Sequence, residues 1–439
     1  MPVQEALTAP PFARRMDALG TENAFKIGPR IREVEQSGRR VIKCNLGEPD
    51  FALAPHIAAE VKRQIDLDQT HYVDPQGIEP LRIAIAKSSG EKRGLKISPD
   101  QVVVFPGAKP PIGFAQQIYC DPGDEVIYPS PGFPIYESFT RFVGAVPVPL
   151  RLREETEFTC RPRDLEPLIT RRTKLLFLNF PSNPTGGVAT REQLEEIAAV
   201  ARYEAPAEMR IYSDEVYEDI IFDGARHHSI ASLRGMAERT IIVSGVSKSY
   251  AWTGGRVGWA ILPTSQEAAA FRNMNINYFS CVPAYNQHGA RVALESPESA
   301  PVIAEMVDAF SRRRDLVVRS LNEIDGITCT TPRGAFYVWP NISGLCRSLG
   351  VLDAYAALPM ETRKQTSPST LFQLFLLYRY QVATLDRRSF GVIGSENEHY
   401  LRVSIATGTD DLEEAMNRFA AAAKDRAGFR RFMDEGRHS

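Results

Sequence analysis

The chain has 439 residues, of which 43% are hydrophobic and 24% charged, and its formal net charge is −2. This is the composition of a globular protein large enough for two domains, and the lack of a basic excess argues against a nucleic-acid partner. The six cysteines are scattered and form no C-x-x-C pair, so we expect neither a metal site of the zinc type nor a disulfide framework. No apolar run approaches the roughly 18 residues of a membrane span, and the N-terminus lacks the apolar core of a signal peptide. We therefore expect a cytoplasmic protein with no membrane contact.

The first part of the chain alternates between helical and strand-like patterns. Apolar residues at helical spacing indicate helices, and short apolar runs bounded by turn residues indicate strands. In chain order we expect a weakly structured arm over 1–20, helices over 26–40, 56–68 and from Pro80, and strands over 41–46, 101–105, 125–128, 145–150 and 175–180.

The middle of the chain continues this alternation. A helix is expected over 190–202 with Thr190 as its N-cap, and strands over 209–213, 241–243 and 260–263. Strands and helices that alternate with short loops indicate an α/β fold with a mainly parallel sheet.

From about residue 301 the pattern changes. We expect a long helix over 301–323 with the run Arg312–Arg314 on a solvated face, a strand pair around Gly334, a strand over 400–406, and a terminal helix capped near Asp410 and Asp411. These segments predict a second, smaller α+β domain made from both chain ends. The expected division is an arm and part of the small domain over 1–50, the large domain over 51–305, and the small domain over 306–439.

The segment Ile241–Trp259 carries the strongest chemical signal. An apolar strand ends in small polar residues around Lys248, and Arg256 follows after Thr253 and two glycines. A lysine at the edge of such a sheet can be partly desolvated, which frees its amine as a nucleophile. The arginine offers a rigid fork for a phosphate or a carboxylate.

Polar residues also follow three other strands. Gly107–Lys109 is a tight strand-to-helix turn, where free N–H groups and the helix dipole favour phosphate, although it is not a P-loop. Asn183 lies in a loop rich in Pro, Ser and Gly, and Asp214 and Tyr217 follow a strand end where a buried acid needs partners. An amine, a phosphate cradle, a carboxylate, a phenol and an amide together suit pyridoxal 5′-phosphate (PLP).

The motifs NLGEPDF, HYVDPQG, PGDEVIYPSPGF, NFPSNPTG, SDEVY, SKSYAWTGGRVGW, GAFYV and LRVSIAT occur in one order between about residues 26 and 422. In order and spacing they resemble the fold-type-I PLP-dependent aminotransferases of class I/II, the aspartate-aminotransferase-like branch. The resemblance implies a PLP-transferase fold with a large PLP-binding domain and a homodimer with shared active sites. It also implies transfer of an amino group from an α-amino acid to a 2-oxo acid, by a ping-pong mechanism through pyridoxamine phosphate.

The resemblance assigns roles around the cofactor. Lys248 would form the Schiff base and then move the substrate proton, and Asp214 would pair with the pyridine nitrogen. Tyr217 and Asn183 would hydrogen-bond the 3-oxygen of the ring, and Phe133 would stack on the ring. The phosphate would be bound by Gly107, Ala108, Lys109, Ser247 and Arg256.

Three further roles concern the substrate and the dimer. Arg402 would clamp the substrate α-carboxylate in a bidentate pair, with help from the Gly47 amide and Asn183. Tyr72 would reach the phosphate site of the neighbouring subunit.

The sequence departs from the family pattern at several places. Gly245 replaces a common phosphate-binding serine, which leaves that role to Ser244 or Ser247, and Gly255 replaces a bulky residue. The run 386–391 lacks the usual Pro-Gly turn, so Arg387 or Arg388 could face the active-site mouth, and the segment 342–380 is long. An acidic substrate would suit Lys109, Tyr278 and Arg388, and an aromatic one would suit Phe133, Tyr136 and Trp252.

Of three alternatives to this interpretation, the first stays open and the sequence argues against the other two. A PLP-dependent lyase, decarboxylase or cyclising enzyme could use the same pocket, because a fold does not fix the reaction. A regulator built on the PLP fold would carry an added DNA-binding domain, for which the short N-terminal arm leaves no room. A nicotinamide enzyme would show G-x-G-x-x-G after a strand, and this chain does not.

Overall fold

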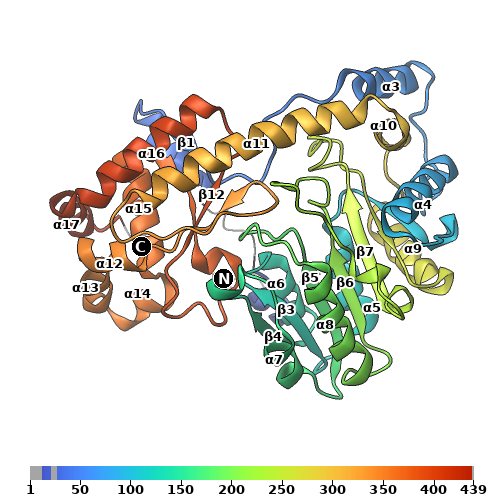
Figure 1. Ribbon diagram of the computed structural model, residues 1–439, viewed down its shortest axis with the longest axis horizontal. Coiled ribbons are helices and arrows are strands. Elements are labelled where there is room, and N and C mark those ends of the chain that lie inside the picture. The colour runs from blue at the N-terminus through green and yellow to red at the C-terminus, as the bar shows by residue number, and fades with distance from the viewer. Residues whose placement is uncertain (1–11, 21–26, 438–439) are drawn as a thin grey trace, which may run out of the picture.

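A seven-stranded sheet lies at the centre of the computed structural model, which describes residues 12–20 and 27–437 (Figure 1). Its strand order is β2-β8-β7-β6-β5-β3-β4; β8 is antiparallel to both neighbours and the other pairs are parallel. The predicted mainly parallel sheet of an α/β fold is therefore confirmed. The strands are β2 (Val102–Phe105), β3 (Glu125–Ser130), β4 (Val146–Arg151), β5 (Thr173–Asn179), β6 (Arg210–Asp214), β7 (Thr240–Gly245) and β8 (Gly258–Ile261).

Helices cover both faces of this sheet, because successive side chains of a strand point to opposite faces. In β5, Leu175 and Phe177 belong to an apolar cluster with α5, α6 and α9, whereas Leu176 and Leu178 pack on the side of α8. Near β2 and β8, the second face is covered by α3, α4 and α10. These helices are α3 (Pro55–Asp66), α4 (Glu79–Arg93), α5 (Pro110–Tyr119), α6 (Pro134–Phe142), α8 (Arg191–Tyr203), α9 (Ser265–Phe279) and α10 (Ala284–Glu295).

Of the two helix N-caps predicted from the sequence, one is confirmed and the other is wrong. Thr190 caps α8 as predicted: its side chain accepts from the Gln193 N–H, and the Gln193 side chain accepts from the Thr190 N–H. The predicted terminal helix instead follows Gly408, so Asp410 lies in its first turn without capping it, and α17 comes after it. Short elements complete the chain: α7 (Pro162–Leu165), η1 (Arg14–Ala18), η2 (Pro99–Gln101), η3 (Glu154–Thr156), η4 (Glu166–Leu168), η5 (Ile230–Ser232), η6 (Ala237–Arg239) and η7 (Arg387–Phe390).

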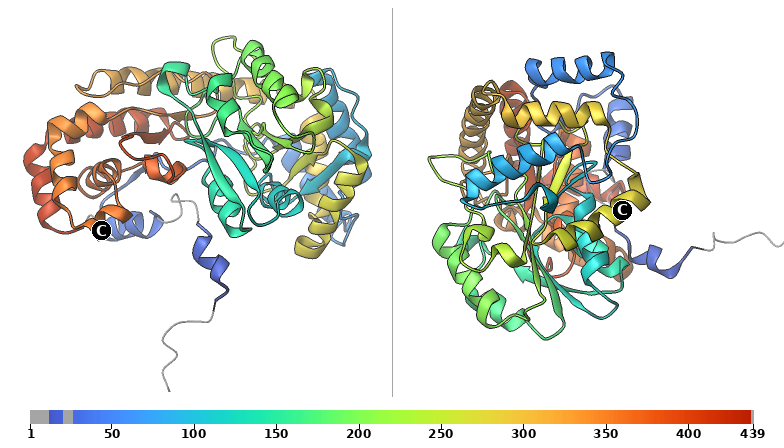
Figure 2. Two further views of the ribbon diagram at one scale, coloured as in Figure 1. Left: turned by 90° about the horizontal axis from the view of Figure 1, so that it is seen from below. Right: turned by 90° about the vertical axis from the view of Figure 1, so that its right-hand side faces the viewer.

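A smaller domain combines segments from both ends of the chain, as predicted. β1 (Ile42–Lys43) pairs in parallel with β10 (Val382–Ala383), and β11 (Leu385–Asp386), β12 (Leu401–Ser404) and β9 (Tyr337–Val338) form an antiparallel sheet. Figures 1 and 2 place its helices at one end of the molecule, with α11 running toward the large domain. The helices are α2 (Gly28–Gln36), α11 (Ser299–Asn322), α12 (Ser343–Leu349), α13 (Val351–Ala357), α14 (Met360–Gln365), α15 (Pro368–Tyr380), α16 (Thr409–Lys424) and α17 (Arg426–Asp434).

The predicted boundaries between the domains stay a prediction. The one after residue 305 falls inside the continuous helix α11. Residues 1–11 of the predicted arm, and residue 26 at the start of the predicted helix 26–40, lie outside the described residues. Within the described parts of the chain, no helix is both long and apolar enough to cross a membrane.

The prediction that the basic run Arg312–Arg314 lies on a solvated face of α11 is wrong for Arg314. The Arg312 side chain is exposed, but that of Arg314 is only 3% exposed and pairs with Asp223 and Asp315. The Arg314 guanidinium also lies 4.8 Å from the centre of the Phe222 ring. The prediction failed because a loop distant in sequence supplies Asp223 and the aromatic face of Phe222, which local spacing cannot reveal.

Candidate active site

The candidate site lies where β5, β6 and β7 reach their carboxyl ends at one edge of the parallel sheet. Asn179, the last residue of β5, ties two of these ends together. Its side-chain amide donates to the Asp214 carbonyl at 3.1 Å, and its side-chain oxygen accepts from the Asn183 N–H at 2.9 Å. The loop that carries Asn183 is therefore fastened to the strand that carries Asp214.

Lys248 lies just beyond β7 and is half-buried. Its Nζ donates to the Gly47 carbonyl at 2.5 Å, and it lies 5.8 Å from the centre of the Tyr217 ring and 5.7 Å from that of Phe336. The amine thus meets the predicted phenol and the segment of Gly47, which comes from the other domain.

Asp214 is buried at the end of β6, with 7% exposure. Burial raises the pKa of its carboxyl from 3.8 to about 6, although the Tyr136 hydroxyl, which donates to Oδ2 at 2.7 Å, acts in the opposite direction. Tyr136 stacks on Phe177, with ring centres 4.7 Å apart, and this fixes the hydroxyl. Sequence reasoning did not assign this role, although Tyr136 follows Phe133 by three positions, at the start of α6.

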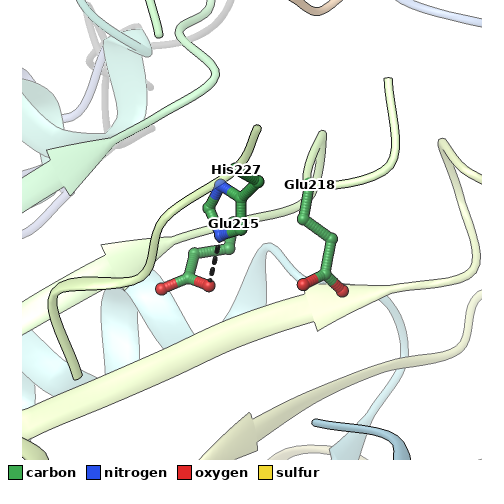
Figure 3. A group of neighbouring side chains, drawn as sticks. All are labelled: Glu215, Glu218 and His227. Carbon is green, nitrogen blue, oxygen red and sulfur yellow. Dashed lines mark hydrogen bonds and ion pairs between the residues drawn. The ribbon is translucent and has the colours of Figure 1, made fainter. Parts of the chain in front are cut away.

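The neighbouring acid, Glu215, belongs to a separate buried ionic cluster. Figure 3 shows the His227 ring facing Glu215, with Glu218 beside them, and the His227–Glu215 distance is 2.8 Å. The Arg93 guanidinium at the end of α4 contacts Glu215 and Glu218, each at 2.5 Å. Burial alone would raise the pKa of Glu215, but Arg93 and His227 outweigh it and hold that pKa well below its usual range. Because Arg93 neutralises both carboxylates, we interpret this cluster as ion pairs that hold the loop from Asp214 to Tyr217 in place.

Gly107 and Ala108 form a tight turn between β2 and the N-terminus of α5. At Gly107, φ is +94°, and a Cβ there would lie 2.2 Å from Nη2 of Arg256. Only glycine therefore allows this close approach. The exposed Arg256 guanidinium donates to the Thr253 and Pro106 carbonyls at 2.7 and 3.1 Å, which holds it beside the turn.

Packing explains why position 245 is a glycine. A Cβ there would lie 2.9 Å from the Gly258 Cα, and a Cβ on Gly258 would lie 2.5 Å from the Ala108 nitrogen. Glycine at both positions therefore lets β7, β8 and the turn pack together. The Ser244 hydroxyl donates to Glu218 at 3.4 Å, whereas Ser247 is half-buried next to Lys248. Of the two serines considered for the phosphate, Ser244 is therefore engaged elsewhere, and the role of Ser247 stays a prediction.

Arg402 on β12 is the most constrained of the predicted residues, with 4% exposure. Its guanidinium donates to the Asn183 side-chain oxygen at 2.9 Å and to the Asn45 carbonyl at 2.7 Å. It also lies over the rings of Tyr337, at 4.3 Å, and Phe390, at 5.0 Å. Within the described residues, its Nε–H has no hydrogen-bond partner and its guanidinium pairs with no carboxylate. A buried cation with neutral partners is suited to bind an anionic ligand.

The remaining predicted residues lie in different surroundings. Phe133 precedes α6 and is half-buried, and the Nζ of the exposed Lys109 lies 5.6 Å from its ring centre. Tyr72 is 87% exposed, so the structure of one chain does not bring it into the site.

The prediction that Arg387 could face the active-site mouth is wrong. Its side chain is 1% exposed, pairs with Glu398 at 2.7 Å and donates to the Gly391 carbonyl at 2.9 Å. It is a structural residue that holds the loop after β11. Arg388 donates to two main-chain carbonyls, those of Thr366 and Lys364.

The residues present fit PLP. The glycine turn beside Arg256 and the start of α5 would hold the phosphate, since a Cβ at Gly107 would fill the space. Asp214 would hold the ring nitrogen, Tyr217 and Asn183 the 3-oxygen, and Lys248 the aldehyde carbon. This donor set matches the groups of the cofactor one by one.

Comparison with known proteins agrees with this geometry. A sequence model described as aminotransferase class I and II matches residues 39–419. The chain is 34% identical to the aspartate aminotransferase of Pyrococcus abyssi, over 90% of this chain and 95% of that protein. It is 37% identical to the aspartate/prephenate aminotransferase of Cereibacter sphaeroides, over 89% and 93%. The crystal structure of the aromatic aminotransferase from Pyrococcus horikoshii matches with a TM-score of 0.79 and 34% identity, over 91% of this chain and 100% of that one. The predicted family is thus confirmed, and the chain belongs to the class I and II aminotransferases.

Proposed function

We propose that the protein transfers an amino group from an α-amino acid to a 2-oxo acid with PLP held at Lys248. When bound, PLP supplies an aldehyde that takes up the amino group and a ring that withdraws electrons from the reacting carbon. The family match favours this reaction over elimination, decarboxylation or cyclisation on the same fold.

The chain's own residues would orient the reactants. Asp214 would keep a proton on the ring nitrogen, because its buried carboxylate is stabilised by a cation placed against it. Arg402 and the Gly47 segment would fix the α-carboxylate, which places the Cα proton near the Lys248 amine. Lys248 would then move that proton from the substrate Cα to the aldehyde carbon of the cofactor.

The observation that carries the proposal is the pairing of Arg402 with Asn183. A buried guanidinium without a carboxylate partner in the described chain meets the amide of Asn183, whose loop is fastened through Asn179 to the strand that carries Asp214. Such a fork recognises a carboxylate in a bidentate pair, and a carboxylate is what every α-amino acid and 2-oxo acid share.

The test is a spectrum followed by turnover. The purified enzyme with PLP should show a visible cofactor absorbance that changes when an amino acid is added, and should form the matching 2-oxo acid. Lys248→Ala should lose both, and Lys248→Arg should serve as the control that keeps the charge without a usable amine. Wild-type turnover by Lys248→Ala would refute the proposal, and release of ammonia or CO2 instead of amino transfer would favour the alternative.

For the substrate, we propose a dicarboxylic amino acid such as aspartate, the substrate named in several relatives. Lys109 is an exposed cation above Phe133 and could meet a second carboxylate. Lys109→Gln should then raise KM for aspartate at least tenfold and leave KM for phenylalanine unchanged. Equal effects on both amino acids would assign Lys109 to the phosphate instead.

We also propose a homodimer with shared sites. Tyr72 is a large exposed aromatic residue, as expected of a side chain that serves a neighbouring subunit. Mixed dimers of Lys248→Ala and Tyr72→Ala chains should regain activity, because one of their two sites would hold both native residues. No regain in mixtures shown to exchange subunits would contradict this arrangement. The cytoplasmic location stays a prediction.

A further inference from the structure

Tyr337 on β9 contacts three parts of the site without having been assigned a role in it. It is 1% exposed. Its hydroxyl lies 2.8 Å from the Tyr217 hydroxyl, and its ring lies 4.3 Å from the Arg402 guanidinium. A Cβ on Gly47 would come within 2.5 Å of the same hydroxyl, so the Gly47 backbone lies directly against it.

These contacts join the two domains. Tyr217 follows β6 of the large sheet, whereas Tyr337 lies on β9, paired with Ser404 of β12 two positions from Arg402. The Tyr217 and Tyr337 rings meet edge to face, with centres 5.8 Å apart and planes at 81°. Tyr337 is therefore held both against the phenol of one domain and against the arginine of the other.

The direction of the hydrogen bond between the two phenols follows from their protons. Each hydroxyl has one proton to donate. If Tyr217 donates to the cofactor's 3-oxygen, its own oxygen can only accept, so Tyr337 must be the donor at 2.8 Å. A hydroxyl that accepts a hydrogen bond is a stronger donor in turn, because chains of hydrogen bonds polarise one another.

The ring of Tyr337 has a separate effect on Arg402. The guanidinium lies 4.3 Å from the centre of the Tyr337 ring and 5.0 Å from that of Phe390. Aromatic faces attract a cation and restrict the plane of the guanidinium. The ring therefore sets the orientation of the fork that would receive the α-carboxylate.

We propose that Tyr337 is a positioning residue that links the carboxylate clamp at Arg402 to the phenol at the cofactor's 3-oxygen, Tyr217. Its hydroxyl acts through Tyr217 and its ring acts through Arg402. This inference rests on the proposed function, since it needs PLP at Lys248.

The experiment separates the two parts of the side chain in the PLP-loaded enzyme. Tyr337→Phe keeps the ring and removes the hydroxyl. The pH titration of the visible cofactor absorbance should then move upward by about half a unit to one unit, because the 3-oxygen loses stabilisation of its ionised form. KM for the amino donor should change less than about threefold, since the ring over Arg402 remains.

Tyr337→Met removes the ring as well and keeps an apolar side chain. It should titrate like Tyr337→Phe but raise KM for the amino donor by about five- to thirtyfold, the loss expected for a desolvated cation–aromatic contact. In a Tyr217→Phe background, Tyr337→Phe should add no further shift, because its effect passes through Tyr217. Tyr400→Phe is the matched control: Tyr400 lies in the same domain as Tyr337, its hydroxyl bonds Glu154 away from the site, and its loss should change neither quantity.

The outcomes distinguish the two proposals. A wild-type titration curve for Tyr337→Phe, in an enzyme that binds PLP and transfers amino groups, overturns the role of the hydroxyl and leaves the proposed function intact. A full additional shift in the Tyr217→Phe background overturns the path through Tyr217. A wild-type enzyme that shows neither cofactor absorbance nor amino transfer overturns the proposed function and this inference with it.

Discussion

Replacing Asp214 by asparagine should stabilise the cofactor-free protein while abolishing its function. The carboxyl has a pKa of about 6 in the folded chain against an ordinary value of 3.8, a rise of about two units caused first by burial. At about 1.4 kcal/mol per unit, the rise corresponds to about 3 kcal/mol. The folded state therefore holds this proton more tightly than the unfolded state does. The resulting stability is fully present below pH 3.8 and is lost as the pH rises through about 6.

Asp214→Asn removes the ionisation but keeps an oxygen that can accept from the Tyr136 hydroxyl. At pH 8 the variant without cofactor should therefore exceed the wild type by up to about 3 kcal/mol in free energy of unfolding. The difference should shrink as the pH falls toward 4. Urea unfolding of both apoproteins at pH 4, 6 and 8, at equal protein concentration, measures this gap. Amino-transfer activity should fall at least a hundredfold, because the amide cannot pair with a protonated ring nitrogen.

Tyr136→Phe is the opposing control. It removes the hydroxyl that favours the ionised carboxyl, so the pKa of Asp214 should rise further and the loss of stability should move to higher pH. The reasoning is refuted if Asp214→Asn and wild type unfold with the same free energy at pH 8, or if their difference does not depend on pH.

Three further predictions concern the clamp, the turn and the ionic support. Arg402→Lys keeps the charge but loses the planar fork, so KM for the amino donor should rise at least tenfold with the cofactor spectrum intact; an unchanged KM would contradict the clamp. Gly107→Ala should weaken PLP binding at least tenfold in an absorbance titration, because its Cβ would lie 2.2 Å from Arg256, whereas Gly254→Ala, in open space, should bind normally. Arg93→Met leaves the buried Glu215 without its guanidinium and Glu218 with only the Lys92 amine at 3.4 Å, and should lower the free energy of unfolding by about 3–5 kcal/mol in urea; a loss below about 1 kcal/mol would show that the cluster is not held by Arg93.

Much of the fold and several site positions follow from the sequence, because strand ends and loops leave local signals. Lys248, Asp214 and Asn183 each follow an apolar strand, and parallel strands end at one edge of their sheet. The sequence does not show which side chains of different helices and strands contact one another. Tyr136 reaches Asp214 from a helix, and Tyr337 reaches Tyr217 from the other domain, and neither distance is encoded in a local pattern.

The two unusual glycines illustrate the same limit. From the sequence, Gly245 and Gly255 read as changes to the phosphate site. In the structure, Gly245 packs against Gly258, and a Cβ on Gly255 would come within 2.3 Å of the Trp252 ring. Both positions therefore have steric reasons for glycine, because the space beside each backbone is already occupied.

Asp214 and Arg402 carry opposite charges, and each is buried among neutral hydrogen-bond partners of the described chain. Glu215 is also buried but meets Arg93, and its pKa is held well below the usual range while that of Asp214 is raised. Glu215, which supports the loop, thus has a counter-charge within the chain, whereas the counter-charge of Asp214 would come from a ligand. Burial of a charge without a counter-charge destabilises the folded state, so any ligand that supplies the counter-charge must bind the folded state more tightly. It follows that the cofactor and a carboxylate substrate should each raise the unfolding temperature, and that each gain should be smaller in the variant that lacks the matching charge.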